Sequence, residues 1–222
     1  MNIFSFFAGS GFLDLGFEQT GYNIKMVNEV LPAFMNSYKY SRMQMHLNQP
    51  EFGYQNTDIN VFLNDRKNEL QDFVSQSQRD EITGFIGGPP CPDFSVAGKN
   101  RGRNGDNGKL SLSYINTILE FQPDFFLFEN VKGLWRTARH RQYFEDLKVM
   151  LHNTGYCTTE KLVNALEFGV PQDRERILLF GVRSDILPEN IKNVNEIIDF
   201  PWNAHIVYNI NDIRNSNWPE TT

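Results

Sequence analysis

The sequence has few cysteines, no long apolar run and no excess of positive charge, and each shortage excludes a class of protein. Cys91 and Cys157 are the two cysteines among 222 residues, too few for a framework of disulfide bonds. A free thiol in a reducing compartment fits better, so we expect a cytoplasmic protein. No group of His and Cys residues has the spacing of zinc ligands, and no structural metal is predicted.

No apolar stretch approaches the length of a membrane span, and Met1–Phe4 lacks the basic lead of a signal peptide. The net charge of −6 argues against a simple nucleic-acid-binding protein. Positive residues nevertheless cluster twice in the chain, at Lys99, Arg101, Arg103 and Lys109 and again at Arg136, Arg139, His140 and Arg141. Either cluster can contact phosphates or form a solvated loop, and the sequence leaves both interpretations open.

Short apolar runs alternate with longer amphipathic stretches, in a chain that is 40% hydrophobic. The short runs predict strands at Ile3–Phe7, Lys25–Asn28, Gly84–Gly87, Phe125–Glu129 and Ile177–Val182. The longer stretches predict helices at Gly11–Thr20, Pro32–His46, Asn60–Val74, Leu110–Phe121 and Gln142–Asn153. The alternation predicts an α/β fold with a mostly parallel sheet and helices on both of its faces.

A glycine turn, Phe7-Ala8-Gly9-Ser10-Gly11, follows the first predicted strand and precedes the first helix. Glycine lets the backbone turn sharply and lets a ligand approach, although a tight turn without a ligand would look the same. A dinucleotide fingerprint would need its third glycine where Asp14 stands, which argues against a nicotinamide oxidoreductase.

Acidic residues follow the next two strands. Glu29 lies about 20 residues beyond the glycines, where a carboxylate can accept hydrogen bonds from ribose hydroxyls. Asp58, in Thr57-Asp58-Ile59, stands at the expected end of the third strand and can contact a nucleobase. Each is a surface carboxylate in the alternative interpretation. Together with the glycine turn they favour a cofactor that contains a nucleoside.

Cys91 follows Gly88-Pro89-Pro90 at the start of a long loop that extends to Gly108. Long loops are commonly functional or disordered, and prolines fix the direction of the thiol. A reactive cysteine is therefore more plausible here than a packing one, and its thiolate needs a positive neighbour or a helix terminus.

Two further polar groups stand at strand ends. Glu129 follows four apolar residues, where partial burial is expected to raise its pKa and let it donate a proton. Arg174 and Arg176 are spaced by two, so an extended backbone would present both on one face. Their forked donors suit a carbonyl or phosphate, and an exposed charged edge strand is the alternative.

In this order the segments resemble the cytosine-5 DNA methyltransferases of restriction–modification systems, from Ile3 to about Val182. The resemblance implies a Rossmann-like methyltransferase fold, S-adenosylmethionine as cofactor, and double-stranded DNA as substrate of a bacterial enzyme. It implies a cofactor site that contains Phe7, Ala8, Gly9, Gly11, Glu29, Asp58, Ile59 and Pro90. It also implies that Cys91 is the nucleophile, that Glu129 binds ring nitrogen 3 of cytosine, and that Arg176, supported by Arg174, lies near its carbonyl oxygen.

The chemistry explains these residue types. Carbon 5 of cytosine is too weak a nucleophile to attack a sulfonium, and addition of a thiolate at carbon 6 makes it reactive. Glu129 and Arg176 would stabilise the charge that develops on the ring. The base has to leave the duplex, and the loop after Cys91, which contains Ser95, is the expected element to close over it.

Four positions depart from the family pattern. Ser5 replaces the usual acid of the first motif, and Phe12 follows Gly11 where a second glycine is common. Pro92 stands after the nucleophile in place of glutamine, and Val30 after the ribose-binding acid in place of an aromatic residue. None of these changes removes a catalytic group.

Family members continue with a target-recognition region and a final segment that returns to complete the cofactor pocket. We therefore expect a catalytic and cofactor-binding domain over residues 1–200 and the start of a connection over residues 201–222. Recognition of the DNA sequence is then expected from a missing C-terminal part or a second chain. The complete enzyme is expected to be a monomer.

Two other functions remain open. One is a transfer-RNA cytosine methyltransferase of the same lineage, although those enzymes carry threonine where this chain has Ser95. The other is a cofactor-binding subunit that is inactive without its recognition part, against which the retention of Cys91, Glu129 and Arg176 argues.

Overall fold

The computed structural model describes residues 1–90, 106–136, 138–191, 194–197 and 199–215. Within this part of the chain a single sheet has the strand order β3-β2-β1-β4-β5-β7-β6. Its strands are β1 (Asn2–Phe6), β2 (Asn23–Asn28), β3 (Tyr54–Gln55), β4 (Thr83–Gly87), β5 (Phe125–Val131), β6 (Tyr156–Asn164) and β7 (Glu175–Arg183). Strands β1 to β5 are parallel to one another, whereas β7 is antiparallel to both β5 and β6. The predicted α/β class with a mostly parallel sheet is confirmed.

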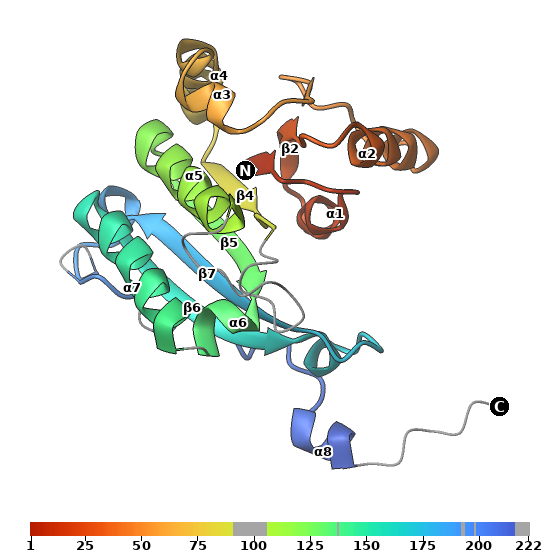
Figure 1. Ribbon diagram of the computed structural model, residues 1–222, viewed down its shortest axis with the longest axis vertical. Helices are drawn as coiled ribbons and strands as arrows, with labels where there is room; N and C mark the ends of the chain where they lie inside the picture. Colours follow the sequence, from red (N-terminus) through yellow and green to blue (C-terminus); the bar gives the residue numbers. More distant parts are fainter. Residues whose placement is uncertain (91–105, 137, 192–193, 198, 216–222) are drawn as a thin grey trace.

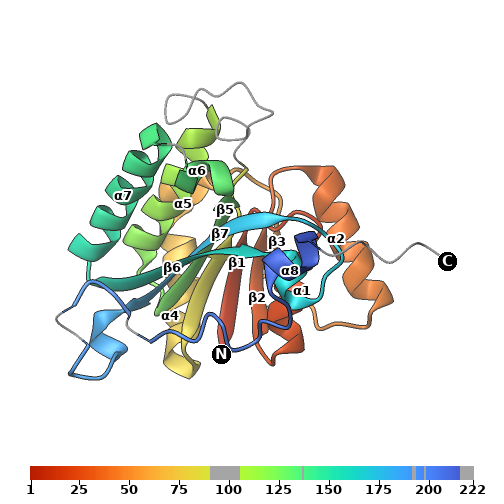
Figure 2. The ribbon, with the colours of Figure 1, turned by 90° about the horizontal axis from the view of Figure 1, so that it is seen from below.

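Helices cover the two faces unequally. The helices are α1 (Phe12–Gln19), α2 (Pro32–Gln44), α3 (Asn60–Leu63), α4 (Lys67–Asp80), α5 (Asp106–Phe121), α6 (Lys132–Arg136), α7 (Ala138–Asn153) and α8 (Ile210–Asn215), with 3₁₀ turns η2 (Ala165–Phe168) and η3 (Ser184–Ile186). Figures 1 and 2 show α4, α5 and α7 side by side on one face, and α1 and α2 on the other. Among the described residues, none of these helices combines the length and apolarity needed to cross a bilayer.

Side-chain alternation along the strands builds one core on each face. Phe4, Phe6, Phe85, Phe126 and Phe128 are all fully buried and face α4, α5 and α7, which accounts for much of the high phenylalanine content. The second core, beneath α1 and α2, is smaller, and Leu127, Phe180 and Val182 at its edge are only partly buried. Phe200, from the C-terminal segment, packs against Phe180 with its ring tilted by 42° and 4.9 Å between ring centroids.

The structure corrects one predicted helix and adds two elements that the sequence did not predict. The helix predicted over Asn60–Val74 is two helices, because the Asn64 side chain bonds the Asn60 carbonyl at 2.7 Å and ends α3 after one turn. Strand β6 was not predicted, since its polar residues hide the usual apolar signal. The short helix α6, directly after β5, was also missed.

The order of the strands decides where a ligand can bind. The connections lead from β1 outwards to β2 and β3, and then back across to β4 and β5 on the other side of β1. The connections that leave the carboxyl ends of the paired strands β1 and β4 therefore run in opposite directions, which leaves a crevice between them. This is the place where open α/β sheets bind their ligands.

Candidate active site and cofactor pocket

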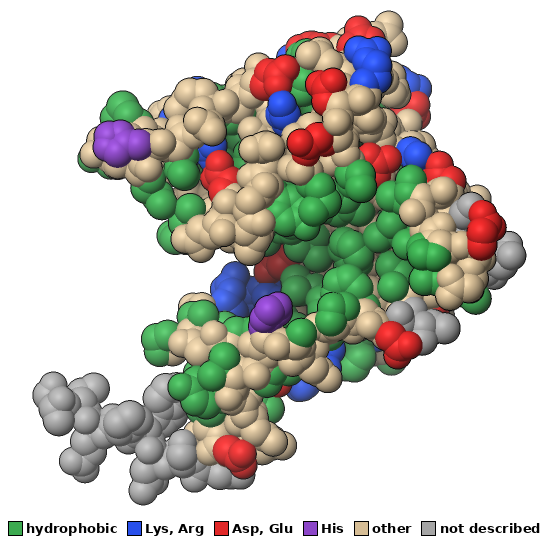
Figure 3. Space-filling model, turned by 180° about the vertical axis from the view of Figure 1, so that it is seen from behind, with side chains coloured by type: hydrophobic (Ala, Val, Ile, Leu, Met, Phe, Trp, Pro, Cys, Tyr) green, Lys and Arg blue, Asp and Glu red, His purple; other side chains and the backbone are tan. Residues whose placement is uncertain are grey.

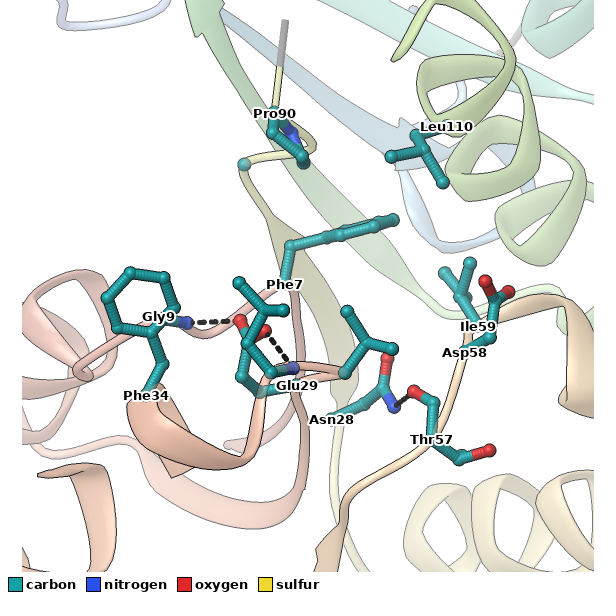
Figure 4. A pocket seen from close by; sticks show the side chains of 13 residues that line it. Phe7, Gly9, Asn28, Glu29, Phe34, Thr57, Asp58, Ile59, Pro90 and Leu110 are labelled. Atoms are coloured by element: carbon teal, nitrogen blue, oxygen red, sulfur yellow. Dashed lines mark hydrogen bonds between the residues drawn. The ribbon is translucent and has the colours of Figure 1, made fainter. Parts of the chain in front are cut away.

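A pocket of about 280 Å³ lies at the carboxyl ends of the first four strands (Figure 4). Each strand contributes the residues that directly follow it, so distant segments of the sequence meet at one edge of the sheet. The pocket is lined by Phe7, Gly9, Asn28, Glu29, Val30, Leu31, Phe34, Thr57, Asp58, Ile59, Gly88, Pro90 and Leu110.

Six of the eight residues expected at the cofactor line this pocket, namely Phe7, Gly9, Glu29, Asp58, Ile59 and Pro90. Ala8 and Gly11 do not. The Ala8 amide donates to the Asn28 carbonyl at 3.1 Å, and Gly11 packs against the ring of Tyr38. Leu31, Phe34 and Leu110 also line the pocket, and no sequence pattern predicts this, since apolar residues near helix ends do not differ in sequence from core residues.

Glu29 is held in place by the backbone around it. Its Oε2 accepts a hydrogen bond from the Gly9 amide at 2.9 Å, and its Oε1 accepts one from the Leu31 amide at 2.8 Å, as the dashed lines in Figure 4 show. The residue is only 7% exposed. The glycine turn after β1 and the start of α2 are thereby tied to one carboxylate, which keeps lone pairs for a ligand hydroxyl.

Phe7 adopts an unusual backbone conformation, with φ of 53° directly after β1. Non-glycine residues occupy this left-handed region at an energetic cost, and such strain gathers at ligand sites. Its ring projects into the pocket (Figure 4) and meets Tyr114 edge-on, with 6.2 Å between centroids. This backbone conformation directs the ring of Phe7 towards the space where a ligand would lie.

Glu129 and Arg176 form an ion pair, with 2.9 Å between Arg176 Nε and Glu129 Oε1. Glu129 lies near the end of β5 and Arg176 near the start of the antiparallel β7, so the two ends meet. Burial and the nearby charge of Arg174 lower the pKa of Arg176. Arg174 itself directly precedes β7 and is exposed, and its effect on the pKa of Arg176 shows that the two arginines lie close together.

Gly88 connects the pocket to this ion pair. It lines the pocket, and a methyl group added to it would lie 2.8 Å from Oε2 of Glu129. Only a residue without a side chain allows the carboxylate to come so close to the backbone. Cys91, three residues later, lies outside the described residues, as do Ser95 and the basic residues Lys99, Arg101 and Arg103.

Ion pairs occupy much of the second basic cluster. Glu175 forms ion pairs with Lys132, at 2.5 Å from Nζ to Oε2, and with Arg136, at 3.1 Å from Nη2 to Oε1. These two contacts connect α6 to the start of β7. Arg141 pairs with both Glu145 and Glu160, each at 2.7 Å. These contacts favour a structural role for the cluster over direct contact of all its members with phosphates.

Asn130, beside Glu129, is almost fully buried at 1% exposure. Its Oδ1 accepts the Val131 amide at 2.8 Å, while within the described residues its Nδ2 has no hydrogen-bond partner. A buried donor of this kind is costly to leave unsatisfied, so it marks the end of β5 as a place where another polar group is needed.

The whole chain matches one protein family. Residues 1–222 align with the family described as C-5 cytosine-specific DNA methylase. The chain belongs to this family. The resemblance inferred from the motifs is thus confirmed.

The chain is similar to curated proteins named as type II methyltransferases. The chain is 52% identical over 221 residues to the type II methyltransferase M.NmeDI of Neisseria meningitidis serogroup C, covering 99% of this chain and 50% of that protein. It is 35% identical over 202 residues to M.FnuDI of Fusobacterium nucleatum, covering 91% and 51%. The chain therefore spans about half the length of these relatives.

Solved structures agree on the fold. A putative DNA modification methyltransferase encoded within an E. coli prophage superposes with a TM-score of 0.64 at 24% identity, covering 83% of this chain and 47% of that one. The Dnmt2 methyltransferase of S. pombe gives 0.59 at 17% identity, covering 89% and 51%. The Rossmann-like methyltransferase fold is confirmed.

Proposed function

We propose that this chain is the catalytic and cofactor-binding part of an enzyme that transfers a methyl group from S-adenosylmethionine to carbon 5 of cytosine in DNA. The observation that carries the proposal is the location of Gly88. It borders the pocket on one side and the Glu129–Arg176 pair on the other, three residues before Cys91. A bound cofactor and a cytosine would then meet at the thiol.

The pocket suits the proposed cofactor. Glu29, fixed by two backbone amides, would hold the ribose hydroxyls, and the Phe7 ring with Ile59 and Leu110 offers apolar surface for a base. Asp58 brings a carboxylate to the same end of the pocket. Bound S-adenosylmethionine supplies an electrophilic methyl group on a sulfonium.

The chain's own residues would activate the cytosine. The Cys91 thiolate adds to carbon 6, so that electron density develops at carbon 5. Glu129 holds ring nitrogen 3 and Arg176 lies beside the ring carbonyl, where their hydrogen bonds stabilise the charge of the adduct. After methyl transfer, loss of the proton on carbon 5 and departure of Cys91 restore the aromatic ring.

Double-stranded DNA is the proposed substrate, with the target base flipped out of the stack. The net charge of −6 supplies little attraction for DNA. We therefore propose that residues 1–200 provide the chemistry, that residues 201–222 begin a connection, and that a further region or second chain provides most contacts to DNA. A monomeric bacterial cytoplasmic enzyme is the proposed complete form.

Part of one sheet face, formed by β5 and β7, is not covered by any helix that the structure describes, and this supports the proposal of a further region. Figure 3 shows a hollow, floored mainly by hydrophobic side chains, on the side away from α5 and α7. Leu127, Phe180 and Val182, in β5 and β7, are only partly buried against the core beneath α1 and α2, and Phe12 at the start of α1 is 84% exposed. Apolar sheet faces are normally covered by helices. We propose that a segment outside these residues covers this hollow and closes the cofactor pocket, around which Phe34 is also exposed.

Covalent trapping tests the proposed function. DNA of mixed sequence that carries 5-fluorocytosine is incubated with S-adenosylmethionine and the chain, completed by any recognition part it requires. Carbon 5 of this base carries fluorine where cytosine carries a hydrogen, so no proton can be lost after methyl transfer and the covalent adduct should persist. It should appear as a DNA-linked band on a denaturing gel, and mass spectrometry identifies the modified residue.

The two cysteines provide a matched control. Cys91→Ser should form no adduct. Cys157→Ser should form as much as the original chain, since Cys157 lies in β6 with its thiol bonded to the Val194 carbonyl at 2.7 Å, and burial raises its pKa. An adduct that survives Cys91→Ser, or none from the completed protein, would show that the proposed mechanism is wrong.

A further inference from the structure

Asp58 is oriented by two donors from one residue. Both the backbone amide and the side-chain Nδ2 of Asn60 donate to its Oδ1, each at 2.8 Å. Oδ2 makes no hydrogen bond to the part of the chain that the structure describes, and Asp58 lines the pocket (Figure 4). The carboxylate therefore offers one free acceptor to a ligand and keeps the other occupied.

A third residue decides which end of the Asn60 amide faces Asp58. The Ser113 hydroxyl, from α5, donates to Asn60 Oδ1 at 2.8 Å. The oxygen of the amide is thereby engaged, and its nitrogen points towards the carboxylate. Ser113 is only 8% exposed, so little water competes for this bond.

The same helix also builds the wall of the pocket. Leu110 lines the pocket one helical turn before Ser113, so both residues lie on the same side of α5. Helix α5 thus contributes apolar surface to the pocket through Leu110 and, through Ser113 and Asn60, determines how Asp58 is presented. Asn60 and Ser113 lie 53 positions apart in the sequence.

We propose that Asn60 and Ser113 are positioning residues that make this pocket select a nucleobase bearing an exocyclic amine over one bearing a carbonyl at the same place. The inference rests on the proposed function, in which Asp58 lies beside the base of the cofactor. The free oxygen of a fixed carboxylate accepts from an amine N–H, whereas a carbonyl oxygen offers no proton and repels it. A mobile carboxylate would turn away from the carbonyl and discriminate less.

The experiment compares S-adenosyl-L-homocysteine with S-inosyl-L-homocysteine, in which a carbonyl replaces the exocyclic amine and ring nitrogen 1 gains a proton. A mobile carboxylate can turn to that N–H, whereas a carboxylate held opposite the carbonyl cannot. Dissociation constants are measured by calorimetry, using the form of the protein that gives the Cys91 adduct. We expect the unaltered protein to prefer the adenosyl ligand by at least about tenfold, the effect of one hydrogen bond to a charged group.

The decisive variant is Asn60→Asp. It keeps the shape of Asn60 and an acceptor for Ser113, but it replaces the donor to Asp58 by a second carboxylate, which repels Asp58. The preference should fall to about threefold or less. Ser113→Ala should reduce it partly, because the amide can then turn over, and Ser113→Thr should restore it by returning the hydroxyl.

Thr117→Val is the matched control on the same helix. Its hydroxyl bonds the Ser113 carbonyl within α5 at 2.8 Å, so the variant loses a buried hydroxyl without changing a contact of Asn60. Its preference should stay unchanged. If Asn60→Asp weakened both ligands by the same factor, the role would be structural and the inference wrong. Failure of the Cys91 adduct would instead refute the proposed function.

Discussion

The buried carboxyl group of Asp14, close to the glycine turn, allows a direct test of how burial raises a pKa and thereby changes the free energy of unfolding. This carboxyl group, in the first turn of α1, is 1% exposed. It accepts hydrogen bonds from Ser5 Oγ and from the Tyr38 hydroxyl, each at 2.7 Å. Burial raises its pKa from 3.8 to about 6, against the lowering effect of the two hydrogen bonds. The substitution Asp14→Asn removes this titration while keeping the shape.

The raised pKa of Asp14 predicts how the free energy of unfolding changes with pH, both in sign and in size. A folded-state pKa above the unfolded value means that the native chain binds the proton more tightly than the unfolded chain between pH 3.8 and about 6. The contribution of Asp14 to stability is therefore fully present below this window and is lost as the pH rises through it. A shift of about two units corresponds to about 3 kcal/mol in the free energy of unfolding.

Urea unfolding at several pH values between 3.5 and 8 measures this effect, through the difference in unfolding free energy between the original chain and Asp14→Asn. The difference should fall by about 3 kcal/mol as the pH rises to 7 and stay level above it. Only the change with pH matters, so any constant cost of the amide cancels. Asp72→Asn, at an exposed position on α4, is the control and should show no comparable fall. A difference for Asp14→Asn that is constant, or that rises with pH, would refute the reasoning.

Two further predictions concern the glycine turn and the uncovered part of the sheet face. Gly11→Ala should destabilise the chain by about 1–3 kcal/mol, because Gly11 has φ of 91° and the new methyl group would lie 2.6 Å from the Tyr38 ring. Gly16→Ala, inside α1 with open space around it, should be neutral or stabilising, and an equal loss in both thermal unfolding curves would contradict this. Phe12→Ser, at an 84% exposed position, should change the stability of the chain by less than about 0.5 kcal/mol, yet weaken its association with the segment proposed to cover the hollow, measured by co-purification. Unchanged association would remove Phe12 from that interface.

The strands and most helices were predictable because local patterns report burial. The apolar runs that became β1, β2, β4, β5 and β7 were recognised, with errors of a few residues at their ends. Strand β6 was missed because its sequence, Tyr156–Asn164, contains threonine, glutamate and lysine instead of an apolar run. Its strand conformation comes from pairing with β7 along its whole length, which is a tertiary interaction.

The candidate site was predictable to the extent that its residues follow strands. Glu29, Asp58 and Glu129 each stand at or just after the carboxyl end of a strand, and the sheet brings such residues to one edge. Asn60 and Ser113 were not predictable, because their role depends on a hydrogen bond across 53 positions of sequence. No local pattern marks such a contact.

The sequence by itself determined the fold class, the family and the residue types of the chemistry, because strand periodicity and short motifs are local properties. The tertiary structure decided how these residues are arranged. It paired Glu129 with Arg176 through an antiparallel strand and placed Gly88 between that pair and the pocket. On the sheet face that α1 and α2 cover, it left the part formed by β5 and β7 without a helix among the described residues. These features depend on the order and direction of strands, which long-range packing selects and no single segment encodes.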